Sequence, residues 1–154
     1  IEPAEKENET DVAAKPEIKI AEKKEVPTPF DLRTRTNELV QTIIVHTPEV
    51  VVRLYDNGEI DDDTISVYLD KRVVLSKKKL TTAPLTVKVK LDETDPEHEL
   101  VMVAENMGRI PPNTSLMIVD AGDKRYEVRI TSTEQQNAMV RFRYVKPGNP
   151  LPLP

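Results

Sequence analysis

Five carboxylates gather around a single glycine in residues 56–63 of this chain. They are Asp56, Glu59, Asp61, Asp62 and Asp63, and the glycine is Gly58. Carboxylate oxygens arranged around a tight turn are the ligands that a hard cation such as Ca²⁺ prefers. The loop is therefore a candidate calcium site with Asp56, Glu59, Asp61 and Asp63 as ligands, and calcium is the one cofactor that the sequence suggests.

The same loop also has a purely structural interpretation. Asn57-Gly58 is a common turn dipeptide, and aspartates in such turns accept hydrogen bonds from backbone amides. The spacing differs from the EF-hand pattern, because Gly58 precedes the acidic cluster and no glutamate occupies the required position. We expect a solvated turn, because acidic surface loops outnumber calcium loops of this shape, and we keep the calcium site as the alternative.

A second loop, residues 104–114, contains a diproline and two asparagines. Pro111-Pro112 fixes two successive φ angles and lowers the entropy lost when the loop becomes ordered. Asn106 and Asn113 are candidate ligand-binding residues, because an amide side chain both donates and accepts hydrogen bonds to a sugar hydroxyl or a peptide. The two amides could equally satisfy the backbone of their own loop.

Aromatic side chains that could stack on a sugar are few. The chain has no tryptophan and four tyrosines. Tyr126 and Tyr144 occupy core-facing positions in their expected strands. Tyr68 lies on the polar face of its strand, so we expect it to be exposed and name it as a candidate ligand-binding residue, with Tyr55 second.

The residues typical of catalytic sites are scarce. The two histidines, His46 and His98, lie at strand ends in polar surroundings, where we expect them to be exposed. The chain has no nucleophile elbow, phosphate-binding glycine loop or zinc-type histidine pair. Its clustered carboxylates lie side by side in one loop rather than on opposite sides of a cleft. The sequence therefore predicts a protein that is not an enzyme.

Period-two alternation of apolar residues dominates the chain from residue 39 onward. The expected strands are 39–45, 50–55, 65–69, 73–75, 85–91, 100–105, 115–119, 126–130 and 137–144. The segments 50–55 and 100–105 are apolar on both faces, and the first is expected to be a central strand. Short strands separated by frequent turns predict an all-β, antiparallel β-sandwich, Ig-like or jelly-roll, of about nine strands. The one expected helical turn is 133–136.

The ends of the chain have a different composition. Residues 1–36 are rich in Glu, Lys, Pro and Ala and cannot bury enough apolar surface to fold, so they predict a disordered tether. The β-sandwich domain is expected over 37–146, followed by a proline-rich tail at 147–154. No apolar run approaches the roughly 20 residues that cross a bilayer.

Two of these stretches resemble a known module. YDNGEIDDDTISVYLD and ELVMVAENMGRIPPNTSLMIV are similar to segments of a module, without an agreed biochemical activity, found in secreted and surface proteins of Bacteroidetes. The resemblance covers residues 40–144. It implies an extracytoplasmic location and a non-catalytic interaction or structural role. The composition of the tether fits a lipoprotein-like stalk or a linker between domains. The chain differs from that module at Asp62 and at Asp70-Lys71, where glycine and Asn-Gly are more usual.

A looser similarity connects the chain to calcium-dependent xylan-binding modules, which are small jelly rolls. The shared features are a strand–turn–strand and a later loop that begins with asparagine. This similarity implies calcium and sugar binding by Asn106 and the acidic residues, although the Asp-Arg-Asn loop motif of those modules is missing. The alternative function is therefore a calcium-supported carbohydrate-binding module.

The charge distribution narrows the class of partner. A net charge of −5 argues against nucleic acid as the ligand. Lys77-Lys78-Lys79 is expected to be a solvated strand edge, which discourages edge-to-edge association and predicts a monomer. The expected partner is a protein or a glycan at the cell surface.

Overall fold

The computed structural model describes residues 26–57, 63–105 and 113–148. Within them, one short helix precedes nine strands. The elements are α1 (Phe30–Thr34), β1 (Thr36–Val45), β2 (Glu49–Asp56), β3 (Thr64–Leu69), β4 (Arg72–Lys79), β5 (Leu85–Lys90), β6 (Glu97–Ala104), β7 (Asn113–Ala121), β8 (Lys124–Ser132) and β9 (Gln136–Tyr144). All nine expected strands are present, so the predicted fold class is confirmed.

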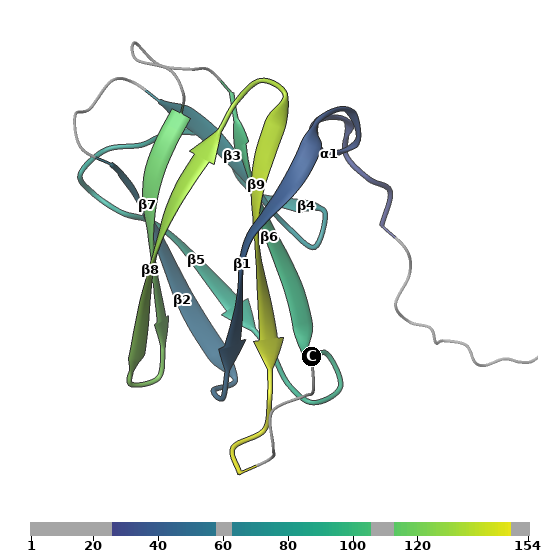
Figure 1. Ribbon diagram of the computed structural model, residues 1–154, viewed down its shortest axis with the longest axis vertical. Helices are drawn as coiled ribbons and strands as arrows, with labels where there is room; N and C mark the ends of the chain where they lie inside the picture. The colour runs from purple at the N-terminus through teal and green to yellow at the C-terminus, as the bar shows by residue number, and fades with distance from the viewer. Residues whose placement is uncertain (1–25, 58–62, 106–112, 149–154) are drawn as a thin grey trace, which may run out of the picture.

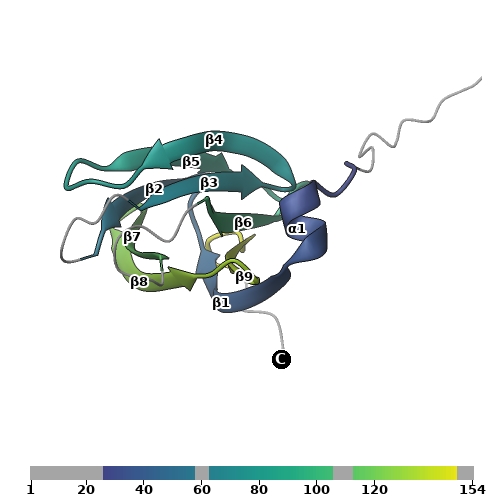
Figure 2. The ribbon, with the colours of Figure 1, turned by 90° about the horizontal axis from the view of Figure 1, so that it is seen from above.

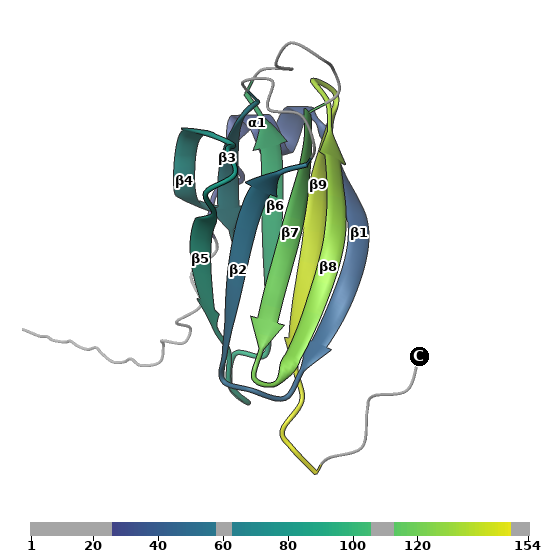
Figure 3. The same cartoon turned by 90° about the vertical axis from the view of Figure 1, so that its left-hand side faces the viewer.

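The strands form two sheets that face each other across a common core (Figures 1 and 3). One sheet has the order β1-β9-β6-β3-β4 and the other has the order β5-β2-β7-β8. Among the described strands, every pair is antiparallel except β1 with β9, which is parallel. None of the helical structure in the described ranges has the length and apolarity that a bilayer crossing requires.

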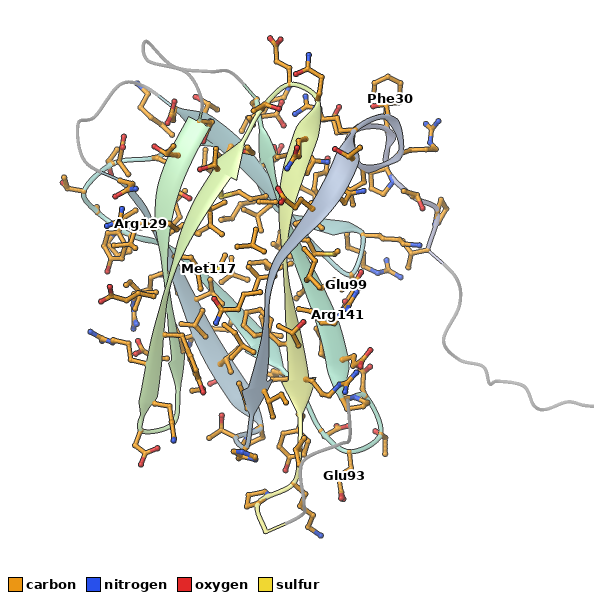
Figure 4. The ribbon with its side chains drawn as sticks, in the orientation of Figure 1. Phe30, Glu93, Glu99, Met117, Arg129 and Arg141 are labelled. Atoms are coloured by element: carbon orange, nitrogen blue, oxygen red, sulfur yellow. The ribbon has the colours of Figure 1, made fainter. Side chains whose placement is uncertain are left out.

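The core follows from the alternation in the sequence. Side chains that point between the sheets are almost fully buried, among them Val50, Val52 and Leu54 of β2, Ile65 and Val67 of β3, and Val140 and Phe142 of β9. Met117 of β7 lies in this layer, as Figure 4 shows. The predicted central position of β2 is confirmed, because β2 lies between β5 and β7. Tyr126 and Tyr144 pack against this core as predicted.

A second, smaller cluster explains why β6 is apolar on both faces. Leu100 and Met102 of β6 point into the main core, whereas Val101 and Val103 point to the other face of the sheet. There they pack against Leu32 of α1, which lies over this outer face (Figure 2). The helix thus removes from water an apolar strip that the sandwich alone leaves exposed.

Helix α1 lies within the range that the sequence assigns to the tether, so folded structure begins before residue 37. Its five residues contain one buried apolar side chain, Leu32, which gives no helical period to detect. Asparagine side chains of β1 and β9 hold it instead. Asn137 Nδ2 donates to the carbonyl of Asp31 over 3.0 Å, and Asn37 Nδ2 donates to that of Leu32 over 2.9 Å. Residues 1–25 and 149–154 lie outside the described residues.

The helical turn expected at 133–136 is wrong. This segment is the tight connection between β8 and β9. Thr133 Oγ1 accepts hydrogen bonds of 3.1 Å from the amides of Gln135 and Gln136. A threonine hydroxyl that satisfies these amides replaces the carbonyl acceptors of a helix, so the chain turns instead.

Two tight turns carry positive φ angles. Gly122, between β7 and β8, has φ 66, a conformation that glycine adopts without a Cβ penalty. The turn between β3 and β4 places non-glycine residues in the same region, with φ 52 at Asp70 and 71 at Lys71. The Asp70 carboxylate accepts a 2.9 Å hydrogen bond from the amide of Glu99, which ties this turn to β6.

Candidate functional site

The described residues that flank the two loops singled out by the sequence lie at the same end of the sandwich. Asp56 ends β2 and is paired in register with Ser115 of β7, and Asp63 directly precedes β3. The Asp63 Oδ2 atom accepts a 3.2 Å hydrogen bond from the amide of Thr114, next to Asn113. The structure thus brings together three candidate residues, Asp56, Asp63 and Asn113. The other loop candidates, Glu59, Asp61 and Asn106, lie outside the described residues.

Asp63 has a structural role at this end of the domain. Its side chain accepts from the Thr114 amide, its carbonyl accepts from the Leu80 amide over 2.8 Å, and the residue is only 1% exposed. The bond from the Thr114 amide matches the amide-capping role that the sequence predicts for these aspartates, but the burial of Asp63 does not fit a solvated turn at this residue. In the parts of the chain that the structure describes, no group of three or more His, Cys, Asp or Glu side chains could hold a metal ion. Calcium binding by the whole loop stays a prediction.

Asn113 also has a structural role. The residue is fully buried, and its Nδ2 donates to the carbonyl of Thr64 over 3.2 Å. This bond links the first residue of β7 to the first residue of β3, across the two sheets. Asn113 thus satisfies a backbone carbonyl of β3 rather than the backbone of its own loop, so its structural role differs from the one that the sequence suggested.

The expectation that Tyr68 is exposed is wrong. Its side chain is half-buried and packs against the small cluster formed with Leu32. Burial raises the pKa of the Tyr68 hydroxyl, and the nearby carboxylates Asp31 and Glu105 raise it further, against the lowering effect of Arg35. Sequence alternation correctly placed Tyr68 on the outer face of the sheet, but it gave no sign that α1 covers that face. The ring is therefore not an open stacking platform.

His98 is likewise not exposed as expected. It is 7% exposed, its Nδ1 lies 2.5 Å from Asp70 Oδ2, and its Nε2 lies 3.1 Å from the carbonyl of Asp95. A histidine beside a carboxylate can act as a general base, but both ring nitrogens are occupied here. The pair joins the β3–β4 turn to β6. His46 is exposed, as predicted.

A groove on the outer face of the four-stranded sheet is lined by both polar and apolar side chains. It has a volume of about 590 Å³. Its lining consists of Arg53, Tyr55 and Asp56 of β2, Thr82 between β4 and β5, Leu116, Ile118 and Asp120 of β7, and Arg125 of β8. We call it the sheet-face groove. It lies on the face turned toward the viewer in Figure 3, the face on which Arg129 is labelled in Figure 4.

One carboxylate organises the polar part of this groove. Asp120 Oδ2 accepts from Arg53 Nη1, and Asp120 Oδ1 accepts from Arg125 Nε over 2.9 Å. The hydrogen bond from Arg125, followed by that from Arg53 and by the two positive charges, lowers the pKa of the Asp120 carboxyl below its usual value. The same partnership raises the pKa of Arg125. Asp120 therefore stays ionised at neutral pH, and its two oxygens orient the two guanidinium groups.

The apolar part of the groove comes from the outward side of β7. Leu116 and Ile118 point away from the core, and Leu116 is paired in register with Tyr55 of β2. The sequence named Tyr55 only as a second aromatic candidate. The available signal was that residues 116–119 are apolar without alternation, which indicates that the outer face of β7 is also partly covered. Arg53, Tyr55 and Asp120 are brought into one site only by the register of β2 against β7.

No protein-family model, curated protein or solved structure matches this chain. The resemblance to the Bacteroidetes module and the looser similarity to xylan-binding modules therefore stay predictions. The two surfaces described above, the loop end and the sheet-face groove, are the candidate functional sites.

Proposed function

We propose that this chain is a non-catalytic, extracytoplasmic interaction module that binds its ligand in the sheet-face groove. The location and the class of protein follow from the resemblance and the tether composition given by the sequence. The binding surface follows from the fold, because the groove lies on the open face of a sheet whose other face forms the core.

The observation that carries this proposal is the Arg53–Asp120–Arg125 network beside an apolar floor. Two guanidinium groups oriented by one carboxylate lose less side-chain freedom when a ligand arrives, which lowers the cost of binding. A volume of about 590 Å³ lies within the range of small-molecule sites, roughly 300–1,000 Å³. Apolar surface with a few fixed polar groups is the usual make-up of such sites.

The same groove offers little support for catalysis. Its described lining contains no histidine, cysteine or serine. Asp120 is held ionised by two guanidinium groups, and a carboxylate with a lowered pKa is a weak proton acceptor. Binding without bond-making is the simpler use of these groups.

The binding surface can be tested without a known ligand by screening a library of small organic fragments against ¹⁵N-labelled full chain in NMR spectra. We expect saturable shifts of backbone amides that cluster on β2 and β7, around Arg53 and Leu116. Arg125→Ala should weaken these shifts, whereas Arg143→Ala should not. Arg143 is the matched control, because it is an arginine paired with Glu97 on the other sheet. Shifts confined to another face, or no saturable shift at all, would contradict the proposal.

A second candidate function, calcium-supported carbohydrate binding, is favoured by the placement of Asp56, Asp63 and Asn113 at one end of the sandwich. A melt of the full chain in excess calcium and then in EDTA tests it. Bound calcium at ~100 times its dissociation constant adds about 2.7 kcal/mol, a rise in melting temperature of roughly ten degrees. Asp61→Ala should abolish that rise. Equal melts with calcium and EDTA would reject the candidate.

A further inference from the structure

The charges that line the sheet-face groove are balanced. Arg53 and Arg125 contribute two positive charges, and Asp56 and Asp120 contribute two negative ones. An anionic ligand gains from the arginines but is opposed by the two carboxylates, and a cationic ligand meets the reverse. The groove therefore has no net charge with which to select an ion. Its chemistry favours a neutral ligand that uses both donors and acceptors.

The polar groups are suited to hydroxyl groups in pairs. A guanidinium is a planar fork with five N–H donors, of which Arg125 uses Nε for Asp120. The Arg125 side chain is 64% exposed, so its remaining donors are within reach of a ligand. The fork can donate to one hydroxyl of a ligand, while the carboxylate beside it accepts from the neighbouring hydroxyl. Adjacent hydroxyls are the defining feature of a sugar ring.

The apolar groups are suited to the other side of the same ring. Tyr55 and Leu116 lie next to each other across β2 and β7, and Ile118 continues this surface along β7. A pyranose has C–H faces that pack on aromatic and aliphatic side chains while its hydroxyls point sideways. A tyrosine provides such a surface with a polar end. The charged groups lie beside the apolar surface of Tyr55, Leu116 and Ile118. This arrangement matches a sugar ring, which is apolar on its face and polar at its rim.

From these observations we propose that the sheet-face groove binds a neutral oligosaccharide without calcium. This inference rests on the proposed function, since it names the ligand class of the same groove. It differs from the calcium-supported alternative in its location, because the loop end contributes only Asp56 to the groove lining. Arg53 and Arg125 bind hydroxyls, Asp120 holds them in place, and Tyr55 with Leu116 carries the ring.

The test is affinity gel electrophoresis of the full chain in EDTA, with soluble polysaccharides in the gel. The neutral probes are arabinoxylan, xyloglucan, glucomannan and mixed-linkage β-glucan, and the anionic probes are polygalacturonate and alginate. We expect retardation by at least one neutral probe. Arg125→Ala and Tyr55→Ala should each lower the association constant about tenfold or more. Arg143→Ala, the matched control, should change it less than twofold.

Several outcomes would overturn the inference. These are the absence of retardation by every neutral probe, retardation by anionic probes alone, and equal retardation of the native chain and Arg125→Ala. Retardation that appears only when calcium replaces EDTA would assign sugar binding to the loop end. That result would also reject the inference. The fragment-induced shifts on β2 and β7 distinguish a failure of sugar binding from a failure of the proposed binding function. If those shifts occur without sugar binding, the groove is a binding surface for another class of ligand, such as a peptide.

Discussion

Lys71 occupies a backbone conformation that suits glycine. Its φ of 71 follows a φ of 52 at Asp70, so both central residues of the β3–β4 turn are left-handed. Such turns prefer Asn-Gly, because an ordinary residue in this conformation costs about 1–2 kcal/mol. Asp70 offsets its cost through bonds to the Glu99 amide and to His98.

Lys71→Gly should raise the free energy of unfolding by about 1 kcal/mol, since relief of the left-handed strain exceeds the added entropy of the unfolded chain. Urea denaturation measures the change. Lys71→Ala is the control, because it removes the charge and keeps the Cβ atom. An equal gain from both variants would show that strain at this position is not the cause.

Asp120 gives the domain a defined response to acid. Its pKa is lowered in the folded protein, so its contribution to stability is complete above the unfolded pKa of about 4 and is lost as the pH falls through the lower folded value. Asp120→Asn should therefore flatten the fall in melting temperature between neutral pH and about pH 3. Melts of the native and variant chains across this range measure it. Parallel curves would show that the arginine pairing adds no pH-dependent stability.

The sequence predicted the strands themselves better than the contacts between strands. The strand containing Val50, Val52 and Leu54 was identified because alternation is a local property. Tyr68 and His98 were misjudged because their burial depends on partners elsewhere in the chain. Arg53 and Asp120 are separated by 67 residues, and only the register of β2 against β7 places them in contact. The groove therefore could not be predicted from motifs in the sequence.

At the scale of elements, α1 depends on the sheet that it covers. A five-residue helix has no stability of its own in water. Leu32 is 6% exposed in the small cluster, and Arg35 Nη1 donates to the carbonyl of Ala104 over 2.9 Å just after the helix. Sequence periodicity missed the helix for the same reason, since the burial of Leu32 and the hydrogen bond from Arg35 both depend on β6.

Leu32→Ala should lower the free energy of unfolding by about 2 kcal/mol, the lower end for a buried leucine, because the cluster is small. It should also speed hydrogen exchange of the amides around α1. Phe30→Ala is the matched control in the same helix, since Phe30 is 67% exposed and should be nearly neutral. Figure 4 shows Phe30 at the outer side of α1. If both variants behave alike, Leu32 is not the residue that holds the helix.

At the scale of the whole molecule, the outer strands determine whether copies associate. The five-stranded sheet ends in β1 and β4, and β4 exposes Val73 and Val74 beside Lys77, Lys78 and Lys79. An edge strand with exposed apolar residues is a site for pairing with another chain, and lysines on the edge oppose it. The positive φ of Lys77 and the irregular register of β3 with β4 further disturb this edge.

The native chain should therefore be a monomer, and replacing Lys77, Lys78 and Lys79 together by threonine should cause concentration-dependent association. Light scattering after size-exclusion chromatography measures both. Lys88→Thr with Lys90→Thr, on the edge strand β5 of the other sheet, tests whether the effect belongs to β4. A monomeric triple variant would show that charge does not protect this edge.

The parallel pairing of β1 with β9 determines how the domain responds to tension. Thr36 at the start of β1 lies beside Gln136 at the start of β9, and Val45 lies beside Tyr144 at their ends. A pull on the segment before β1 and on the segment after β9 therefore drags the two strands past each other in opposite directions. All hydrogen bonds of the ladder then carry the load together instead of opening one by one. A module tethered at one end and held at the other is mechanically strongest in this geometry.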